Sequence, residues 1–473
     1  MLDQQLIDQF VLVVGAKYVL QSPDQQAPYL TEWRDKYQGA TKLVLLPGSV
    51  DEVAAIVRLA NQTATPLVPQ GGNTGLVGGQ LPDLSGEQVV VSLKRLNKKR
   101  SISPVSQSMI VEAGVTLFEA QDYAQEHERL FPLSLASEGS CQIGGNLSTN
   151  AGGIQVLKYG MMRDLVLGLE VVLPSGEIWR GLSDLRKDNT GYDLKALFLG
   201  AEGTLGIITA ACLKLFPLPV ERQVAFVACR SLEQMANLFE RVSEQAGACL
   251  CAFEMLSHRG LDFSLQFLSA QGQAGEPPLK TIWPWYGVIE LESTQQGVVE
   301  PLLETVLEKA LSQQLIEEAV LSSSQAQRQS LWAFREVMSE AQKPQGGSIK
   351  HDVSVPVAQI PAFIQQADAV VEKMIPGARA VPFGHFGDGN IHYNVSQPEG
   401  ADKNDFLSKW EALNEAVYEV VLDFNGSISA EHGIGVMKRD LLARVKDPVA
   451  LDLMKTVKKA LDPNKIMNPG KVL

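Results

Sequence analysis

Two glycine-rich segments constrain the fold of this chain more than any other feature. The first, Gln70–Gln80, has five glycines within nine positions and directly follows Thr65–Pro69, a short apolar stretch typical of a buried strand. Glycine has no Cβ, so the backbone there can bend sharply and approach another group closely. Successive backbone N–H groups in such a loop can surround an anion such as a diphosphate. A flexible surface loop is the alternative interpretation.

The second segment, Glu138–Gly153, is unusually small and polar. Close approach of the backbone to a flat or charged ligand is the physical use of such a run. The GxGxxG fingerprint of a Rossmann domain does not occur anywhere in the sequence. Its absence disfavours an NAD-binding domain of that type.

A third stretch, Pro382–Val395, holds two of the six histidines of the chain. Its Gly-Asp-Gly-Asn centre predicts a tight turn between two short strands. On the second strand His392 and Asn394 are two residues apart and therefore lie on one face. His385 precedes the turn and could face the same space, which would give two imidazoles suited to a divalent metal such as zinc. An ordinary loop with two histidines is the alternative.

A further histidine lies in the stretch Ala430–Gly435, next to a carboxylate. Glu431 and His432 are neighbours, and neighbours on an extended chain face opposite ways. They share one site only if the backbone bends, which the following glycines permit. Glu431 is therefore a candidate third ligand.

Two cations precede the histidine turn in the sequence. A helix is predicted over residues 325–342. On it Trp332, Arg335 and Ser339 recur at spacings of three and four and so share one face. The strand that follows presents Lys350. Taken singly, Arg335 and Lys350 are most simply surface charges, but together they could receive a carboxylate, for which Arg offers a bidentate fork.

The length of the chain predicts more than one domain. A chain of 473 residues exceeds one ordinary core. Pro217 and Pro219 mark a boundary, because prolines favour an extended linker. Beyond it strands alternate with helices, which predicts an α+β domain with an antiparallel sheet covered on one face. Residues 261–280, rich in Gln, Ala and Gly, are expected to be irregular. We place the domains at residues 1–219, 220–425 and 426–473.

Charge and cysteine content limit the partners. A net charge of −13 and a pI near 5.1 argue against nucleic acid as a partner. The five cysteines form no CxxC pair, so no iron–sulfur cluster or other electron relay is expected. The N-terminal residues mix Asp3, Asp8 and Lys17 into the apolar ones, unlike a signal peptide. No apolar run reaches the roughly 18 residues of a membrane span. We expect a cytoplasmic protein without an integral membrane segment.

Motifs in order from about Trp33 to Leu473 resemble those of the FAD-dependent 2-hydroxy-acid dehydrogenases, a family of the vanillyl-alcohol oxidase superfamily. The matching stretches are Pro69–Gly75, Gly144–Gly153, Lys187–Asp193, Gly384–His392, Glu431–Gly433 and the ending Asp462–Gly470. The resemblance implies a two-part FAD-binding domain of the vanillyl-alcohol oxidase / p-cresol methylhydroxylase type. It further implies an α+β substrate-cap domain with an antiparallel sheet, and a C-terminal helical segment that returns to the flavin.

The activity implied by the resemblance is oxidation of a D-2-hydroxy acid, in the first place D-2-hydroxyglutarate, by hydride transfer to FAD. The implied cofactor contacts lie in the two glycine-rich segments and in a later glycine bend: Gln70, Gly71, Gly72, Asn73, Thr74, Gly75, Gly139, Ser140, Gly144, Gly145, Asn146, Thr149, Asn150, Gly152, Gly153, Glu202, Gly206 and Ile207. Some relatives attach the flavin covalently through a His that follows the Gly-Gly pair. Asn73 stands at that place here, so we expect a dissociable FAD.

The resemblance also gives roles to the other candidate residues. It implies the metal ligands His385, His392 and Glu431 for zinc or manganese, the general base His432, and the substrate contacts Arg335, Ser339, Lys350 and Asn394. Ser339 departs from the Thr of close relatives but keeps the hydroxyl.

Other functions stay open at this stage. D-lactate or glycolate dehydrogenases belong to the same family, and there the basic pair would serve the C1 carboxylate. A flavin-free metal hydrolase could use His385, His392 and Glu431 to activate water, but it would leave both glycine-rich segments unexplained. A small-molecule binding module would need no base at His432. The family resemblance further suggests a homodimer. Because the sequence has no cysteine cluster, we expect the electrons to pass to an external acceptor such as an electron-transfer flavoprotein or a quinone.

Overall fold

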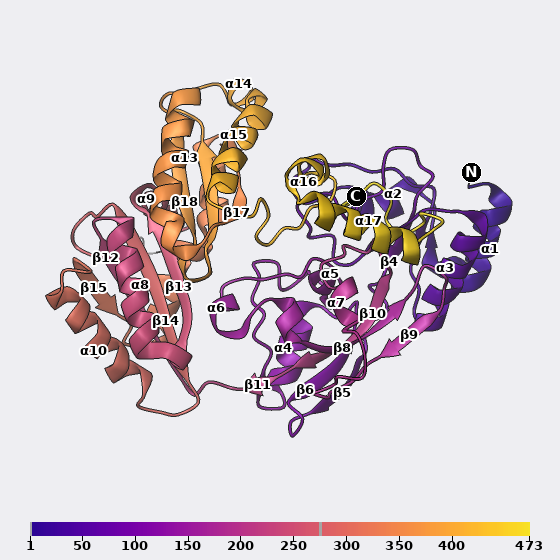
Figure 1. Ribbon diagram of the computed structural model, residues 1–473, viewed down its shortest axis with the longest axis horizontal. Helices are drawn as coiled ribbons and strands as arrows, with labels where there is room; N and C mark the ends of the chain where they lie inside the picture. The colour runs from indigo at the N-terminus through magenta and orange to yellow at the C-terminus, as the bar shows by residue number, and fades with distance from the viewer. Residues whose placement is uncertain (1, 274–276) are drawn as a thin grey trace. The chain divides into compact units, whose positions relative to one another are not determined.

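The computed structural model describes residues 2–273 and 277–473 (Figure 1). The chain forms two compact units. The first contains the residues up to Gly152 together with Gly160–Leu218 and Glu431–Leu473. The second contains Gly153–Tyr159 and Pro219–Ala430. The chain thus passes from the first unit to the second and back twice, once for Gly153–Tyr159 and once for Pro219–Ala430.

The first unit begins with a four-stranded sheet of order β1-β2-β4-β3. Strands β2, β4 and β3 run parallel, and β1 is antiparallel to β2. The apolar faces of α1 and α3 pack in one core with these strands, and Phe10 and Ile56 are fully buried there. α3 begins where Ser49 Oγ accepts a hydrogen bond from Glu52 N at 3.2 Å. The elements are α1 (Gln4–Val14), β1 (Val19–Leu20), α2 (Pro23–Leu30), β2 (Val44–Leu45), α3 (Val50–Thr63), β3 (Leu67–Gln70) and β4 (Val89–Ser92).

A five-stranded antiparallel sheet of order β5-β6-β10-β8-β9 forms the other half of the first unit. Its elements are β5 (Lys99–Ser103), β6 (Ser108–Glu112), α4 (Leu117–Gln125), α5 (Ile143–Ser148), β8 (Val166–Val172), β9 (Ile178–Gly181), α7 (Lys195–Phe198) and β10 (Ile207–Lys214). The short strands β7 (Arg129–Leu130) and β11 (Phe216–Pro217) pair with each other.

The C-terminal segment completes the first unit. It contains α16 (Arg439–Val445) and α17 (Pro448–Leu461), drawn in yellow in Figure 1. The residues after α17 then pair with β3, since Leu67 N donates to Ile466 O at 2.7 Å and Asn468 N donates to Leu67 O at 2.8 Å. The end of the chain therefore extends the sheet whose strand β3 leads into the first glycine-rich loop.

The second unit is built on an antiparallel sheet of order β15-β12-β14-β13-β18-β19-β16, with β17 also paired to β19 (Figure 1). Its elements are α6 (Val156–Tyr159), β12 (Glu221–Cys229), α8 (Leu232–Ala246), β13 (Leu250–Ser257), α9 (His258–Ala270), β14 (Trp285–Ser293), α10 (Val299–Ser312), β15 (Glu318–Leu321), α11 (Gln325–Glu336), α12 (Met338–Ala341), β16 (Ser348–Ile349), β17 (Asp352–Ser354), α13 (Ile360–Met374), β18 (Arg379–His385), β19 (Asn390–Ser396), α14 (Lys403–Ser408) and α15 (Trp410–Asp423).

Helices cover both faces of this sheet, so the predicted one-sided cover is wrong. Helices α9, α11 and α12 pack on the face that carries Phe226 and Val288. α8 packs on the opposite face, where the ring of Phe239 lies 5.1 Å from that of Phe253 on β13. Because helices bury both faces of the sheet, its strands carry apolar side chains on both sides.

Two further local predictions need correction. Within 261–280, expected to be irregular, the first part continues α9, whose side chains Leu261 and Leu268 join the core, while residues 274–276 lie outside the described part of the chain. The helix predicted over 325–342 is interrupted at Val337, whose ψ of −6° departs from the roughly −42° of a regular α-helix, and α12 begins at Met338. Within the described residues, no helix is both long and apolar enough to cross a membrane.

Candidate active site

The two glycine-rich segments lie against each other in the first unit. A Cβ added at Gly72 would lie 2.0 Å from the carbonyl oxygen of Ser140, and one at Gly144 would lie 2.7 Å from the Cβ of Ala113. A side chain at either position would therefore collide with its neighbour. The missing Cβ at Gly72 lets the loop after β3 pack on the turn that leads into α5, and the missing Cβ at Gly144 lets the start of α5 approach Ala113, just after β6.

Several buried polar atoms in these segments have no hydrogen-bond partner among the residues that the structure describes. They are Gln70 Oε1, Asn73 Oδ1, Gln142 Oε1 and Asn146 Nδ2. A buried polar group without a partner is costly, so native proteins usually satisfy it. A ligand with many polar groups would satisfy them here. Three of these atoms are acceptors and one is a donor, so the segments fit ligand groups that can both donate and accept hydrogen bonds, such as the hydroxyls of the FAD ribityl chain.

Other side chains predicted as cofactor contacts hold the first unit together. Asn73 Nδ2 donates to the carbonyl oxygens of Pro28 at 3.0 Å and Thr31 at 2.9 Å, which fixes the first loop. Thr149 Oγ1 donates to Gly145 O at 3.0 Å, at the end of α5.

Glu202 holds the turn that follows His432. Its two carboxylate oxygens accept hydrogen bonds from Ile434 N at 2.7 Å and Gly435 N at 2.8 Å. Burial raises the pKa of the Glu202 carboxyl above its ordinary value, although these hydrogen bonds and Lys438 act in the opposite direction. Both oxygens are therefore engaged with protein, and the side chain positions the backbone after His432.

The remaining predicted cofactor contacts differ in exposure. Gly139 and Ser140 are exposed, whereas Gly206 and Ile207 are buried. A Cβ added at Gly206 would lie 3.0 Å from Val172 O on β8, so this glycine allows close strand packing. The half-buried positions are Gly71, Gly72, Thr74, Gly75, Gly145 and Asn150, and the other buried ones are Gly144, Gly152 and Gly153.

In the second unit the predicted histidine turn joins β18 to β19, and both flanking strands are confirmed. The register pairs Phe383 with His392 and His385 with Asn390. Gly389 ends the turn at a φ of +85°, a conformation that favours glycine. The imidazole centroids of His385 and His392 lie 5.5 Å apart. The turn therefore brings the two rings side by side.

Carboxylates face the Nδ1 atom of each ring. Glu254 Oε1 on β13 lies 2.8 Å from His385 Nδ1, and Asp352 Oδ1 lies 3.9 Å from His392 Nδ1. Metal-binding histidines commonly present one nitrogen to such a carboxylate and the other to the metal. This arrangement suits Nε2 as the ligand atom of His385.

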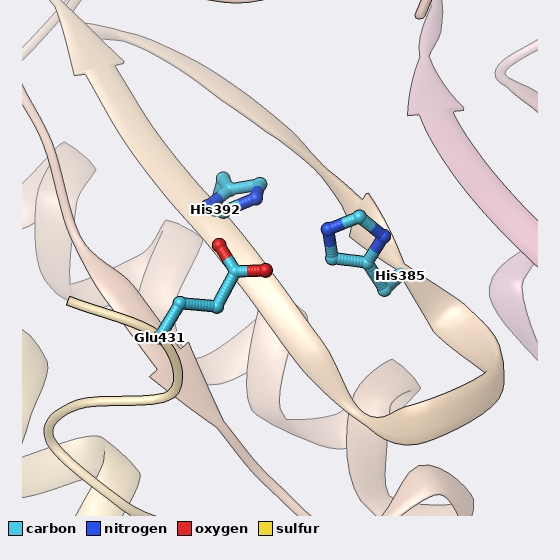
Figure 2. A group of neighbouring side chains, drawn as sticks. All are labelled: His385, His392 and Glu431. Atoms are coloured by element: carbon cyan, nitrogen blue, oxygen red, sulfur yellow. The ribbon is translucent and has the colours of Figure 1, made fainter. Parts of the chain in front are cut away.

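Glu431 follows Ala430, whose N–H donates to Asp352 O at 3.4 Å. One oxygen of Glu431 and one ring nitrogen from each of His385 and His392 lie within 4.8 Å of one another. Figure 2 shows the carboxylate directed toward the space between the two rings. Two imidazoles and one carboxylate form a ligand set known from catalytic zinc sites, so the residues fit a divalent metal.

Arg335 is buried, with 6% exposure, and is no surface charge. Its Nε donates to Glu254 Oε2 at 2.8 Å, and its guanidinium carbon lies 4.9 Å from the centroid of the Phe383 ring. Nη2 is buried and has no hydrogen-bond partner among the described residues. Burial and the hydrogen-bonded charges of His385 and Arg335 act oppositely on Glu254, and the net effect lowers the pKa of its carboxyl.

The face predicted for Trp332, Arg335 and Ser339 is only partly formed. Trp332 is buried and donates through Nε1 to Glu290 Oε2 at 2.5 Å. Ser339, which lies beyond the break at Val337, is exposed. Lys350 Nζ donates to the carbonyl oxygen of Ser339 at 3.2 Å.

Two residues next to the site, Gln342 and Glu254, were not predicted from the sequence. Asn394 Nδ2 donates to Gln342 Oε1 at 2.7 Å, and Gln342 is itself buried with an Nε2 that lacks a partner among the described residues. No sequence signal marks Gln342. Glu254 did carry a signal, because it is a lone charge within the apolar strand Leu250–Ser257.

Both parts of the chain match families of flavoproteins. The model for the FAD binding domain matches residues 41–181, and the model for the C-terminal domain of FAD linked oxidases matches residues 218–472. Among solved structures, p-cresol methylhydroxylase is similar at a TM-score of 0.75 and 20% identity, over 99% of this chain and 96% of that one. An alkyldihydroxyacetonephosphate synthase is similar at a TM-score of 0.75 and 17% identity, over 99% and 85%. These likenesses confirm the vanillyl-alcohol oxidase fold.

Curated proteins show similarity over the full length. D-2-hydroxyglutarate dehydrogenase of Stutzerimonas stutzeri (strain A1501) is 37% identical over 100% of this chain and 99% of its own. The mitochondrial D-2-hydroxyglutarate dehydrogenase of Rattus norvegicus is 38% identical over 96% and 82%. A D-2-hydroxyglutarate–pyruvate transhydrogenase of Saccharomyces cerevisiae is 35% identical over 96% and 90%. The chain therefore belongs to the FAD-dependent D-2-hydroxy-acid dehydrogenase family.

Proposed function

We propose that this protein oxidises D-2-hydroxyglutarate to 2-oxoglutarate, with non-covalent FAD as hydride acceptor and a divalent metal that binds the substrate. The environment of Arg335 is the observation that favours a diacid as substrate. Its buried guanidinium has an unpartnered Nη2 and shares Glu254 with the candidate metal ligand His385. A five-carbon diacid has two carboxylates, and the site offers one group for each.

FAD supplies, when bound, the acceptor that takes the C2 hydrogen of the substrate as hydride. Its polar groups would contact the unsatisfied atoms of Gln70, Gln142 and Asn146. The side chain of Asn73 is an amide that already donates to Pro28 and Thr31. An amide is a poor nucleophile, which supports a flavin held without a covalent bond.

His385, His392 and Glu431 would hold the metal, and zinc or manganese suits two imidazoles and a carboxylate. A metal there would lower the pKa of the substrate hydroxyl and orient the C2–H bond. The reaction also needs a general base that removes the hydroxyl proton.

His432 is the residue that we assign to this proton. An imidazole titrates near the working pH and can accept the proton on a ring nitrogen while the C2 hydrogen leaves as hydride. The alcohol then loses one proton and one hydride, and the C2–O bond becomes a carbonyl. Glu202 supports this role, because it fixes the turn directly after His432.

The distal carboxylate would bind Arg335, with Lys350 close to Ser339 as the second cation. Asn394 would provide a further substrate contact, held in place by Gln342. A D-lactate or glycolate dehydrogenase is the runner-up, in which these cations would serve the C1 carboxylate. The match to an FAD binding domain argues against the flavin-free hydrolase.

The test compares a diacid with a monoacid in Arg335→Ala. We expect kcat/KM for D-2-hydroxyglutarate to fall by about a hundredfold, because a buried carboxylate loses its charged partner. The kcat/KM for D-lactate should fall by less than about threefold, because this monoacid has no distal carboxylate for Arg335 to bind. Arg328→Ala, on the same helix, is the control. Equal losses for both substrates would contradict the assignment of Arg335 to the distal carboxylate.

We further infer that the electrons leave FAD for an external acceptor, such as an electron-transfer flavoprotein or a quinone. All five cysteines are free thiols, which supports this inference. The name of the yeast relative gives pyruvate as the partner of its own transhydrogenase reaction. A homodimer and a cytoplasmic location are our expectations, although the rat and Arabidopsis thaliana relatives are named mitochondrial.

A further inference from the structure

We propose that Glu254 is a positioning residue that holds the candidate metal ligand His385 and the substrate-binding Arg335 in one geometry. Metal binding and recognition of the distal carboxylate would then be coupled through one side chain. The inference rests on the function proposed above. It concerns residues of the second unit only.

The placement of Glu254 follows from strand pairing. β13 pairs with β18, with Met255 opposite Gly384 and Leu256 opposite Phe383, so Glu254 lies beside His385. The side chain is 1% exposed. Each carboxylate oxygen has a different partner, since Oε1 lies 2.8 Å from His385 Nδ1 and Oε2 accepts from Arg335 Nε at 2.8 Å.

The contact with His385 selects a tautomer of the imidazole. A carboxylate accepts hydrogen bonds and does not donate them, so His385 Nδ1 carries the proton and Nε2 keeps its lone pair. The hydrogen bond also fixes the orientation of the ring. Partners of this kind typically change metal affinity by 10- to 100-fold when they are removed.

The contact with Arg335 fixes the plane of the guanidinium. Nε is held by Glu254, and the guanidinium carbon lies 4.9 Å from the centroid of the Phe383 ring. With the plane fixed, the buried Nη2 keeps one direction, and it has no other hydrogen-bond partner among the described residues. Arg335 is therefore oriented toward a ligand before the ligand arrives.

Glu290 provides a matched comparison within the same sheet. It lies on β14, the neighbour of β13, and is also buried, with 9% exposure. Its hydrogen bond comes from Trp332, one helical turn before Arg335 on α11. Glu290 therefore resembles Glu254 in burial and in its link to α11, but its partner is neither a candidate ligand nor a substrate contact.

The first measurement is metal affinity, which does not depend on turnover. FAD-loaded wild type, Glu254→Gln and Glu290→Gln are freed of metal and titrated with zinc against a competing chromophoric chelator. We expect Glu254→Gln to bind zinc about 10- to 100-fold more weakly. Glu290→Gln should stay within about threefold of wild type, because it leaves the His385 hydrogen bond intact.

The second measurement is the ratio of kcat/KM for D-2-hydroxyglutarate to that for D-lactate at saturating zinc. Glu254→Gln should lower this preference about tenfold, because Arg335 loses its orientation. When Glu254→Gln is added to the Arg335→Ala variant, the kcat/KM ratio of the double variant should equal that of Arg335→Ala alone. Its zinc binding should still be weaker. If Glu254→Gln does not fold, Glu254→Asp replaces it, since its shorter carboxylate can satisfy only one partner.

Three outcomes overturn the inference. Zinc binding by Glu254→Gln as tight as by wild type would show that Glu254 does not position His385. Equal losses of zinc affinity in Glu254→Gln and Glu290→Gln would make Glu254 a carboxylate needed only for the fold. A wild-type protein that binds no zinc or manganese would instead contradict the metal in the proposed function, and the inference would fall with it.

Discussion

Single residues of the second unit combine deep burial with polar atoms that the protein leaves unsatisfied. Arg335 and Gln342 each have a buried nitrogen without a partner among the described residues. Both nitrogens are donors, and a carboxylate is an acceptor of hydrogen bonds. Such donors favour an anionic ligand, because leaving them unpaired costs about 1–3 kcal/mol each.

Gln342→Leu tests whether these unpartnered donors help to bind the substrate. The change removes the acceptor of Asn394 Nδ2 and the unpartnered Nε2 together. We expect the KM for D-2-hydroxyglutarate to rise about tenfold, while kcat changes by less than about threefold, because binding is weakened more than the chemical step. Steady-state kinetics measure both constants. An unchanged KM would exclude Gln342 and its hold on Asn394 from substrate binding.

The sequence alone predicted the site residues that lie in local motifs. His385 and His392 follow from a glycine turn and a period of two, which are properties of neighbouring residues. Glu254 and Gln342 act through contacts with residues 131 and 52 positions away. No local pattern encodes such a contact, although the lone charge in an apolar strand hinted at Glu254.

At the scale of elements, one helix covers a row of buried carboxylates. Trp332 and Arg335 on α11 bind Glu290 on β14 and Glu254 on β13. Burial raises the pKa of both carboxyls, but at Glu254 the charges of His385 and Arg335 outweigh burial and the net pKa is lowered. Burial raises the pKa of Glu290, a repulsive Glu292 adds to the rise, and the Arg222 charge and the Trp332 hydrogen bond only partly offset it.

The raised pKa of Glu290 predicts a pH-dependent stability. An acid whose pKa is higher in the folded state binds its proton more tightly there, so its favourable contribution is lost as pH rises through the folded pKa. Glu290→Gln has no such proton. We expect the Tm of Glu290→Gln to rise relative to wild type between pH 4.5 and pH 8. A Tm difference that is constant or falls with pH would contradict the raised pKa.

Element prediction succeeded where the hydrophobic period was clear. The strands around the histidine turn follow from local rules. α9 was missed, because the Gln, Ala and Gly residues that follow Ser269 favoured one irregular segment over the whole of 261–280. No Pro or Gly marks the break at Val337, so helix propensity gives no signal for it.

At the scale of the whole chain, the two units are not consecutive in sequence. Gly153–Tyr159 belongs to the second unit, where Tyr159 donates to Glu292 and Lys158 Nζ lies 3.2 Å from a Glu292 oxygen. The C-terminal residues pair with β3 in the first unit. These links join residues far apart in the chain, so prolines and composition could indicate the boundary near residue 219 but not the exchanges.

The reaction that we propose for the whole chain is oxidation of D-2-hydroxyglutarate by a bound flavin. Anaerobic mixing of the purified, FAD-loaded protein with D-2-hydroxyglutarate, its L enantiomer, D-lactate and glycolate tests it most directly, with flavin absorbance as the readout. We predict rapid bleaching by D-2-hydroxyglutarate, one 2-oxoglutarate formed per flavin, and loss of the reaction after treatment with a chelator. A protein without flavin, or a flavin bleached equally well by D-lactate, would contradict the account.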